Sequence, residues 1–251
     1  MSQTCVVFAA GTYYGNEPSA RELPDHAFVV AADGGLDHVC KADIRPNLAI
    51  GDFDSAKTKV PQDIEVITLP PEHDDPDMLS ALKVGWSRGC RDFRIYGGLG
   101  GRLDHTIANI QLLALLARNG GHGLLYGEHS VITAICNGSM HFPAHALHLG
   151  DAVNADNRMV SVFSHSDVSH GVTETGLKYE LQNGTMHNDT VLGVSNELLD
   201  DRSSTISVAD GTLIVTFPTE AASPTFKTEI KSAETLGPLA SHVSALLNKS
   251  R

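Results

Sequence analysis

Short apolar runs alternate with segments of helical periodicity through the first half of the chain. Each run is rich in β-branched or aromatic residues and stops at glycine, aspartate or proline, which is the pattern of a buried strand in a parallel sheet. The predicted strands are 4–10, 28–32, 48–50, 64–69 and 93–96. Apolar positions at helical spacing predict helices over 36–42 and 75–88, and a third predicted helix ends near Arg118.

The helix predicted over 75–88 carries its own start signals. Asp75 is expected to cap it, and Pro76 suits the first turn because its fixed φ already matches a helix. Trp86 lies on the apolar stripe and is expected in the core. Strands that alternate with helices predict an α/β fold, here an N-terminal, doubly wound and mainly parallel sheet with helices.

After Gly120-Gly121 the pattern changes to short alternating runs separated by turn residues. Turns are expected at Asn183-Gly184 and Asp210-Gly211, pairs that suit tight hairpins. This half therefore predicts an antiparallel, β-sandwich-like C-terminal domain. The predicted strands are 124–126, 131–136, 158–163, 168–173, 177–181, 191–195, 205–208 and 212–217.

We expect an α/β domain over 1–140, a β-domain over 141–218, and a linker with a candidate C-terminal helix over 219–251. The helix would span 233–247, where leucines and a valine form an amphipathic stripe that Gly237-Pro238 interrupts.

The 251-residue chain has 18 basic and 30 acidic residues, a net charge of −12. This balance argues against nucleic acid or an anionic membrane as the main partner, although a few cations can neutralise a nucleotide's phosphates locally. No apolar run approaches the roughly 20 residues that span a bilayer, and no signal peptide is recognised. The four cysteines form no CxxC pair, so we expect reduced thiols and a cytoplasmic protein.

The segment 97–105, Gly-Gly-Leu-Gly-Gly-Arg-Leu-Asp-His, joins a predicted strand to a predicted helix. Glycines let the backbone approach a ligand closely, and the N–H groups at a helix start attract an anion such as phosphate. Arg102 adds a planar fork of donors suited to phosphate oxygens. Asp104 places a carboxylate where phosphate is expected, and a bound metal ion would resolve that conflict. His105 is expected to support the loop by a hydrogen bond.

Asp52 and Asp54 follow a predicted strand. Residues two apart in an extended backbone point the same way, so both carboxylates would share one face. Such hard oxygen ligands suit Mg²⁺. The alternative is a solvated acidic turn, but Asp33, Asp77 and Asp104 occupy comparable positions on neighbouring elements and favour a metal site.

Asp74 and Asp75 are explained by the positive end of the helix dipole, whereas Asp77 could point into the ligand cleft. Three histidines would suit a metal only on a helix, and Pro143 interrupts their segment, so we expect them on the surface: His141, His145 and His148.

Five short motifs occur along the chain. Each is a weak signal by itself, but their combination is specific. The N-terminal motifs are Ala32-Asp33-Gly34-Gly35, Gly51-Asp52-Phe53-Asp54-Ser55, and the loop 97–105 with Asn109. The C-terminal motifs are Gly176-Leu177-Lys178-Tyr179 and Val194-Ser195-Asn196. Over residues 4 to about 217, their order and spacing resemble the thiamin pyrophosphokinase (thiamine diphosphokinase) family.

The resemblance implies an N-terminal domain for ATP and Mg²⁺ and a C-terminal domain for thiamine. It implies metal ligands at Asp52, Asp54 and Asp77. The implied catalytic residues are Asp54, Asp77, Arg102 and Asp104. The implied nucleotide-binding residues are Asp33, Gly34, Gly35, Asp52, Gly98, Gly100, Gly101, His105 and Asn109. The implied thiamine contacts are Tyr179, Ser195 and Asn196.

The implied reaction moves a diphosphoryl group from ATP to the thiamine hydroxyl, which gives thiamine diphosphate and AMP. The resemblance also implies a homodimer whose active sites lie between the α/β domain of one chain and the β-domain of the other. Either Asp77 or Asp104 could take the hydroxyl proton, and the sequence does not choose between them.

This chain departs from the family pattern Lys-Asp-x-Thr-Asp, because His73 stands for the lysine and Pro76 for the threonine. The β-domain also has no tryptophan, and Tyr179 is the candidate substitute for one that packs on thiamine. Two other readings stay open: another Mg²⁺-dependent phosphotransferase or nucleotide hydrolase, and a catalytically weak thiamine- or nucleotide-binding module.

Overall fold

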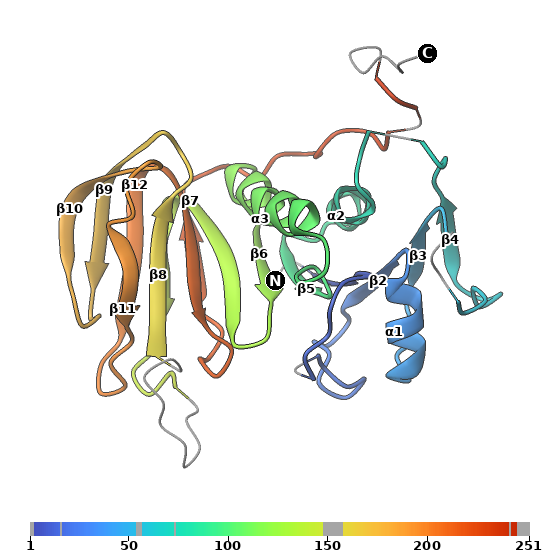
Figure 1. Ribbon diagram of the computed structural model, residues 1–251, viewed down its shortest axis with the longest axis horizontal. Helices are drawn as coiled ribbons and strands as arrows, with labels where there is room; N and C mark the ends of the chain where they lie inside the picture. The colour runs from blue at the N-terminus through green and yellow to red at the C-terminus, as the bar shows by residue number, and fades with distance from the viewer. Residues whose placement is uncertain are drawn as a thin grey trace. The chain divides into compact units, whose positions relative to one another are not determined.

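The structure, a computed structural model, describes residues 3–15, 17–53, 57–72, 74–147, 158–240 and 242–244. The chain forms two compact units (Figure 1). Unit 1 comprises Met1–Asn109 with Glu234–Arg251, and unit 2 comprises Ile110–Ala233. Unit 1 is therefore discontinuous in sequence.

This division falls within helix α3 (Leu103–Arg118), whereas the sequence predicted a domain boundary at residue 140. The physical reason is the pairing of the next two strands. β6 (His122–Tyr126) and β7 (Ser130–Phe142) are as apolar as the parallel strands before them, but they pair with each other antiparallel. β7 then continues for 13 residues as a central strand of unit 2.

The sheet of unit 1 confirms the predicted parallel α/β arrangement. Its strands run in the order β5-β1-β2-β3-β4, and every neighbouring pair is parallel. The chain moves outward from β1 to β4 and then returns to place β5 on the other side of β1, which makes a topological switch point between β1 and β5. The strands are β1 (Thr4–Phe8), β2 (Phe28–Ala32), β3 (Leu48–Gly51), β4 (Glu65–Thr68) and β5 (Asp92–Tyr96).

Helices α1 (Gly35–Lys41) and α2 (Asp77–Ser87) lie on opposite sides of this sheet in Figure 1. Trp86 of α2 is buried as predicted, 1% exposed, with its ring stacked on Phe93 of β5 at a centroid distance of 6.2 Å.

Asp75 does not cap α2, and that prediction is wrong. The N-cap position is Pro76, which makes no side-chain capping hydrogen bond. The carboxylate of Asp75 instead accepts a hydrogen bond from Lys83 Nζ on the same helix at 2.6 Å.

Unit 2 is an antiparallel β-structure, as predicted. The long strand β12 pairs along its whole length with β7, while its first part pairs with β9 and its last part with β8. The strands of unit 2 enclose a separate apolar core, which includes Phe142, Val162 and Phe217. The remaining strands are β8 (Met159–Ser164), β9 (Val168–Thr175), β10 (Leu181–His187), β11 (Gly193–Glu197), β12 (Ser204–Pro218) and β13 (Thr225–Thr228).

Both predicted turn pairs lie inside strands. Asn183-Gly184 falls in β10 and Asp210-Gly211 in β12, and the pairing register shifts beside each of them. Asn183 has φ +49° and Gly211 has φ +124°. The positive φ values that suggested hairpin turns are thus used for irregularities in continuous strands.

The segment after residue 218 is not a simple linker. β13 pairs antiparallel with β7. The predicted C-terminal helix is absent from residues 233–240 and 242–244, the part of that span which the structure describes. Pro238 disfavours helical backbone at the residue before it and lacks an N–H. Hydrogen bonds with Lys83 and Asp75 also take up the carbonyl of Pro238 and the N–H of Ala240.

None of the helices in the described ranges is long and apolar enough to cross a membrane. All four cysteines are free, and Cys5 and Cys90 are buried.

Candidate functional site

A cavity of about 460 Å³ lies at the carboxyl ends of the strands of unit 1. It opens at the switch point, between the loops that follow β1 and β5, which is where ligands bind in open parallel sheets. The predicted residues that line it are Asp33, Asp77, Gly98, Gly100, Gly101, Arg102, His105 and Asn109. These residues come from segments that are separate in the sequence, and the fold brings them to one cavity.

Asp33 stands directly after β2 and has φ +46°. Its N–H donates to the carbonyl of Ile50 on β3 at 2.8 Å. This hydrogen bond extends the pairing of β2 with β3 by one residue and holds Asp33 at the carboxyl end of the sheet. Asp52 follows β3 and is partly buried, but it does not line the cavity. Asp54 lies outside the described residues.

The loops after β1 and β5 are joined by backbone hydrogen bonds. The N–H of Gly11 donates to the carbonyl of Gly97 at 2.7 Å. Gly97 has φ +67°, and a Cβ there would lie 2.5 Å from the carbonyl oxygen of Ala9. Only glycine can therefore stand at this position, because the two loops meet backbone to backbone.

Asn109 shapes the glycine loop from α3. Its side chain is 6% exposed and its Nδ2 donates to the carbonyl of Gly98 at 2.7 Å. Since the hydrogen bond ties the helix to the loop, Asn109 fixes the loop conformation in addition to lining the cavity.

Arg102 and Asp104 form a two-point ion pair. Arg102 Nη2 lies 2.6 Å from Asp104 Oδ2, and Arg102 Nε lies 3.1 Å from Asp104 Oδ1. Their side chains are 73% and 64% exposed. Such an exposed pair contributes little to stability, so a phosphate group can replace the carboxylate on the guanidinium at small cost. The hydrogen bond from Arg102 lowers the pKa of Asp104 to about 2.

Gly34 and Gly35 have a packing role in the fold. Gly34 is the N-cap of α1, and Gly35 begins the helix. A Cβ on Gly35 would lie 2.0 Å from the carbonyl oxygen of Phe8, so the helix start packs directly on the backbone of β1. Neither glycine lines the cavity.

In unit 2, Asn196 holds the loop that carries Tyr179. Asn196 is 6% exposed and its amide makes four hydrogen bonds. Its Nδ2 donates to the carbonyl of Tyr179 at 2.7 Å, and its Oδ1 accepts from the N–H of Tyr179 at 3.0 Å. Its Nδ2 also donates to Glu174 Oε2 at 3.0 Å. Burial raises the pKa of Glu174, and the hydrogen bond from Asn196 opposes that rise.

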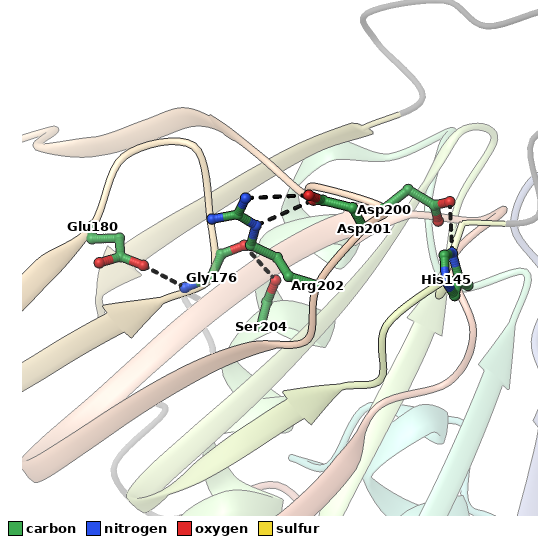
Figure 2. A network of polar contacts seen from close by, with 7 residues as sticks. All are labelled: His145, Gly176, Glu180, Asp200, Asp201, Arg202 and Ser204. Carbon is green, nitrogen blue, oxygen red and sulfur yellow. Dashed lines mark hydrogen bonds and ion pairs between the residues drawn. The ribbon is translucent and has the colours of Figure 1, made fainter.

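The same loop is fixed at its other end. Figure 2 shows Gly176 between two polar side chains: Glu180 Oε1 accepts from its N–H at 2.8 Å, and Ser204 Oγ donates to its carbonyl at 2.9 Å. The loop therefore presents Tyr179, whose side chain is 64% exposed, from a rigid backbone. Ser195 is also exposed, with φ +62°.

The histidines expected on the surface are there where the structure describes them. His141 and His145 are exposed, and His145 Nδ1 lies 3.2 Å from Asp200 Oδ2 (Figure 2). His148 lies outside the described residues. Within the described ranges, no three His, Cys, Asp or Glu side chains form a ready-made metal cluster.

Some cavity residues had no functional signal in the sequence. Gly11 and Met78 line the cavity beside the predicted residues. Gly11 could have been found, because it ends the first predicted strand just as Gly97 ends the fifth. The sequence pattern does not reveal that these two strands are neighbours, and the lining of the cavity depends on that adjacency.

Replacing Arg102 tests the ion pair at the cavity rim. In the native protein the pKa of Asp104 is lowered to about 2, and in Arg102→Gln it should rise toward the ordinary value of 3.8. A carboxyl group with a lowered pKa favours the folded state above its ordinary pKa, and this advantage is lost as the pH falls toward about 2. The carboxyl-carbon resonance of Asp104, followed by NMR titration, measures the change.

Asp37 is the control for that titration. Its pKa is lowered by hydrogen bonds from Thr58 and from the N–H of Lys57, and these do not involve Arg102. Its titration should be the same in both proteins. An unchanged pKa of Asp104 in Arg102→Gln would contradict the ion pair.

The chain matches both domains of one enzyme family. Residues 20–122 match the family described as thiamin pyrophosphokinase, catalytic domain, and residues 145–213 match thiamin pyrophosphokinase, vitamin B1 binding domain. The thiamine pyrophosphokinase of Bacillus subtilis (strain 168) is 29% identical over 196 residues, which are 76% of this chain and 87% of that protein.

Solved structures share the fold. The crystal structure of thiamine pyrophosphokinase from Bacillus subtilis has a TM-score of 0.73 at 26% identity, over 87% of this chain and 100% of that one. The crystal structure of thiamin pyrophosphokinase from Geobacillus thermodenitrificans has a TM-score of 0.70 at 26% identity, over 86% of this chain and 98% of that one. With both domains matched in order and the fold shared with these structures, the chain belongs to the thiamin pyrophosphokinase family.

Proposed function

We propose that this enzyme transfers a diphosphoryl group from ATP to the hydroxyl of thiamine, releasing AMP and thiamine diphosphate. The observation that supports the reaction best is the cavity of unit 1, where Asp33, Asp77 and the glycine loop converge at the switch point of a parallel sheet. A site with backbone N–H groups, an arginine and carboxylates suits a nucleotide triphosphate with its metal ion. Unit 2 would bind thiamine.

The donor set fits Mg²⁺. Asp52, Asp54 and Asp77 would hold the ion, and all three offer hard oxygen ligands. Mg²⁺ keeps several waters and takes phosphate oxygens as further ligands, so it needs no cluster of three protein ligands in the free enzyme. When bound, the ion supplies positive charge that neutralises the phosphates.

The protein's part in the reaction is positioning and charge stabilisation. The thiamine hydroxyl would attack the β-phosphorus in line with the departing AMP, a step that requires little covalent help. The N–H groups of Gly98, Gly100 and Gly101 would bind phosphate oxygens, and Arg102 would stabilise the charge that develops on them.

Asp77 is the better candidate for the general base. The family resemblance leaves both Asp77 and Asp104 open as the group that takes the hydroxyl proton. Asp77 lines the cavity, whereas Asp104 does not line it and is exposed beside Arg102.

On the thiamine side, Tyr179 and Ser195 would contact the substrate directly, and Asn196 would act through the loop that it fixes. We also propose a cytoplasmic homodimer with active sites between the nucleotide-binding part of one chain and the thiamine-binding part of the other. Large apolar side chains exposed on unit 2 support a surface that a second copy covers: Tyr179, Val191, Leu192 and Val194.

The test is AMP formation from ATP and Mg²⁺, with and without thiamine, together with detection of thiamine diphosphate. AMP that depends on thiamine and matches the product in amount is the expected result. Release of ADP, or nucleotide cleavage that ignores thiamine, would instead favour another phosphotransferase or hydrolase. Thiamine or nucleotide binding without turnover would identify a binding module, the reading that His73 and Pro76 motivate.

Removing a carboxylate charge at the proposed metal site should abolish most turnover. Asp54→Asn and Asp77→Asn should each lower kcat by about 100-fold or more, because the metal ion or the base is lost while the volume of the side chain is kept. Asp25→Asn, on an exposed aspartate outside the cavity, is the matched control and should keep its kcat. Steady-state rates at several Mg²⁺ concentrations measure the effect. Near-native turnover in Asp54→Asn would refute the metal assignment.

Truncating Asn196 should weaken thiamine use and the stability of unit 2. Asn196→Ala leaves Glu174 buried without its amide donor and frees the Tyr179 loop, so unfolding should become easier by about 1–3 kcal/mol. KM for thiamine should rise while KM for ATP stays the same. Asn188→Ala, which removes an exposed hydrogen bond to Asp167, is the control. Urea denaturation measures the free energy of unfolding, and steady-state kinetics measure the two KM values. An unchanged KM for thiamine would contradict the role of the loop.

A further inference from the structure

The start of α2 places Asp77 at the cavity. The helix begins immediately after Pro76, which makes no side-chain cap hydrogen bond. Proline also offers no backbone N–H with which to anchor the entering chain. Pro76, Asp77 and Met78 all line the cavity, so any displacement of the helix start changes the shape of the site.

The C-terminal part of the chain contacts the residues that lead into α2. We name residues 236–240 and 242–244 the C-terminal strap. Asp75 Oδ2 accepts a hydrogen bond from the N–H of Ala240 at 3.1 Å. One residue earlier, the carboxylate of Asp74 accepts from the N–H of Ser244, with distances of 3.0 and 2.9 Å to its two oxygens. Two successive carboxylates before the helix are thus held by strap backbone.

Lys83 of α2 contacts both Asp75 and the strap. Its Nζ lies 2.6 Å from Asp75 Oδ2 and donates to the carbonyl of Pro238 at 2.7 Å. The side chains of Lys83 and Asp75 are each only 11% exposed. A buried ion pair is stable only when further hydrogen bonds satisfy its polar atoms, and the strap provides one to each partner.

The strap lies outside the part of the chain that matches the family. The second family domain ends at residue 213, before the strap begins. The strap residues nevertheless belong to the same compact unit as the cavity.

We propose that the C-terminal strap positions Asp77 for the reaction. Asp75 and Lys83 act as positioning residues, because their hydrogen bonds with the strap hold the start of α2 in place. The inference rests on the proposed function. Asp75 is two residues from Asp77, so fixing its carboxylate fixes the path of the chain into the helix. An error of about 1 Å in the placement of a reacting group can lower a rate about 100-fold.

Two variants test the strap without touching the cavity. A chain that ends at Thr235 lacks the strap but keeps the Asp75–Lys83 pair. Ala240→Pro removes the single N–H that donates to Asp75 and keeps the rest of the chain. Ala240→Gly, which keeps that N–H, is the matched control, and a chain that ends at Asn248 controls for shortening.

We expect kcat to fall about 10- to 100-fold in both test variants, with KM for thiamine within about twofold of the native value. Hydrogen exchange at the amides of 77–80 should accelerate, while exchange in β1 and β2 stays native. A synthetic peptide of residues 234–251, added to the shortened chain, should restore part of kcat. If the strap merely stabilised unit 1, its removal would speed exchange throughout that unit.

Native kcat in the shortened chain, or exchange that accelerates equally across unit 1, would overturn the proposal. The exchange measurement needs no substrate. If the native enzyme formed no thiamine-dependent AMP, the proposed function would fail, and the exchange pattern would still decide whether the strap holds the start of α2.

Discussion

The contact between the loops after β1 and β5 is the constraint on which the site depends. β1 pairs with β2 on one side and β5 on the other, so the chain reverses its direction of travel across the sheet at this point. Two loops leave the same edge in opposite directions and open a space between them. Gly11 and Gly97 join those loops by their backbones, and larger residues would force them apart.

Polar groups around that space are held by partners in the protein. Asn109 is bonded to the glycine loop, Arg102 to Asp104, and Asp75 to Lys83. The buried contacts are stiff, because an unpaired polar atom in the interior is expensive. The exposed pair of Arg102 and Asp104 is the exception, since water can replace either partner. The site therefore combines a rigid frame with one arginine that is ready to exchange a carboxylate for a phosphate.

Periodicity and motif order predicted most of the fold. The parallel strands and α2 were found within a few residues, because β-branched runs and an apolar stripe are local signals. The expected helix over 233–247 failed because its stripe competes with Pro238 and with long-range hydrogen bonds from Lys83 and Asp75. The turns expected at Asn183 and Asp210 failed because a residue with positive φ can also form a bulge.

The same contrast between local signals and long-range contacts applies to the site residues. Asp33, Asp77 and Arg102 could be selected because the predicted α/β fold brings strand ends, the glycine loop and helix starts to one edge of the sheet. Asn196 was recognised only through the family motif. Its structural part, four hydrogen bonds that hold the backbone of Tyr179 and a buried Glu174, depends on strands far apart in the sequence. No local pattern records such a partnership.

The discontinuity of unit 1 bears on how the protein is made. Residues 74–83 emerge from the ribosome early, whereas the strap that bonds to them is about 160 positions later, beyond all of unit 2. The hydrogen bonds between the strap and the start of α2 can therefore form only after unit 2 has been synthesised. Unit 1 gains its full set of contacts only when the end of the chain has been made.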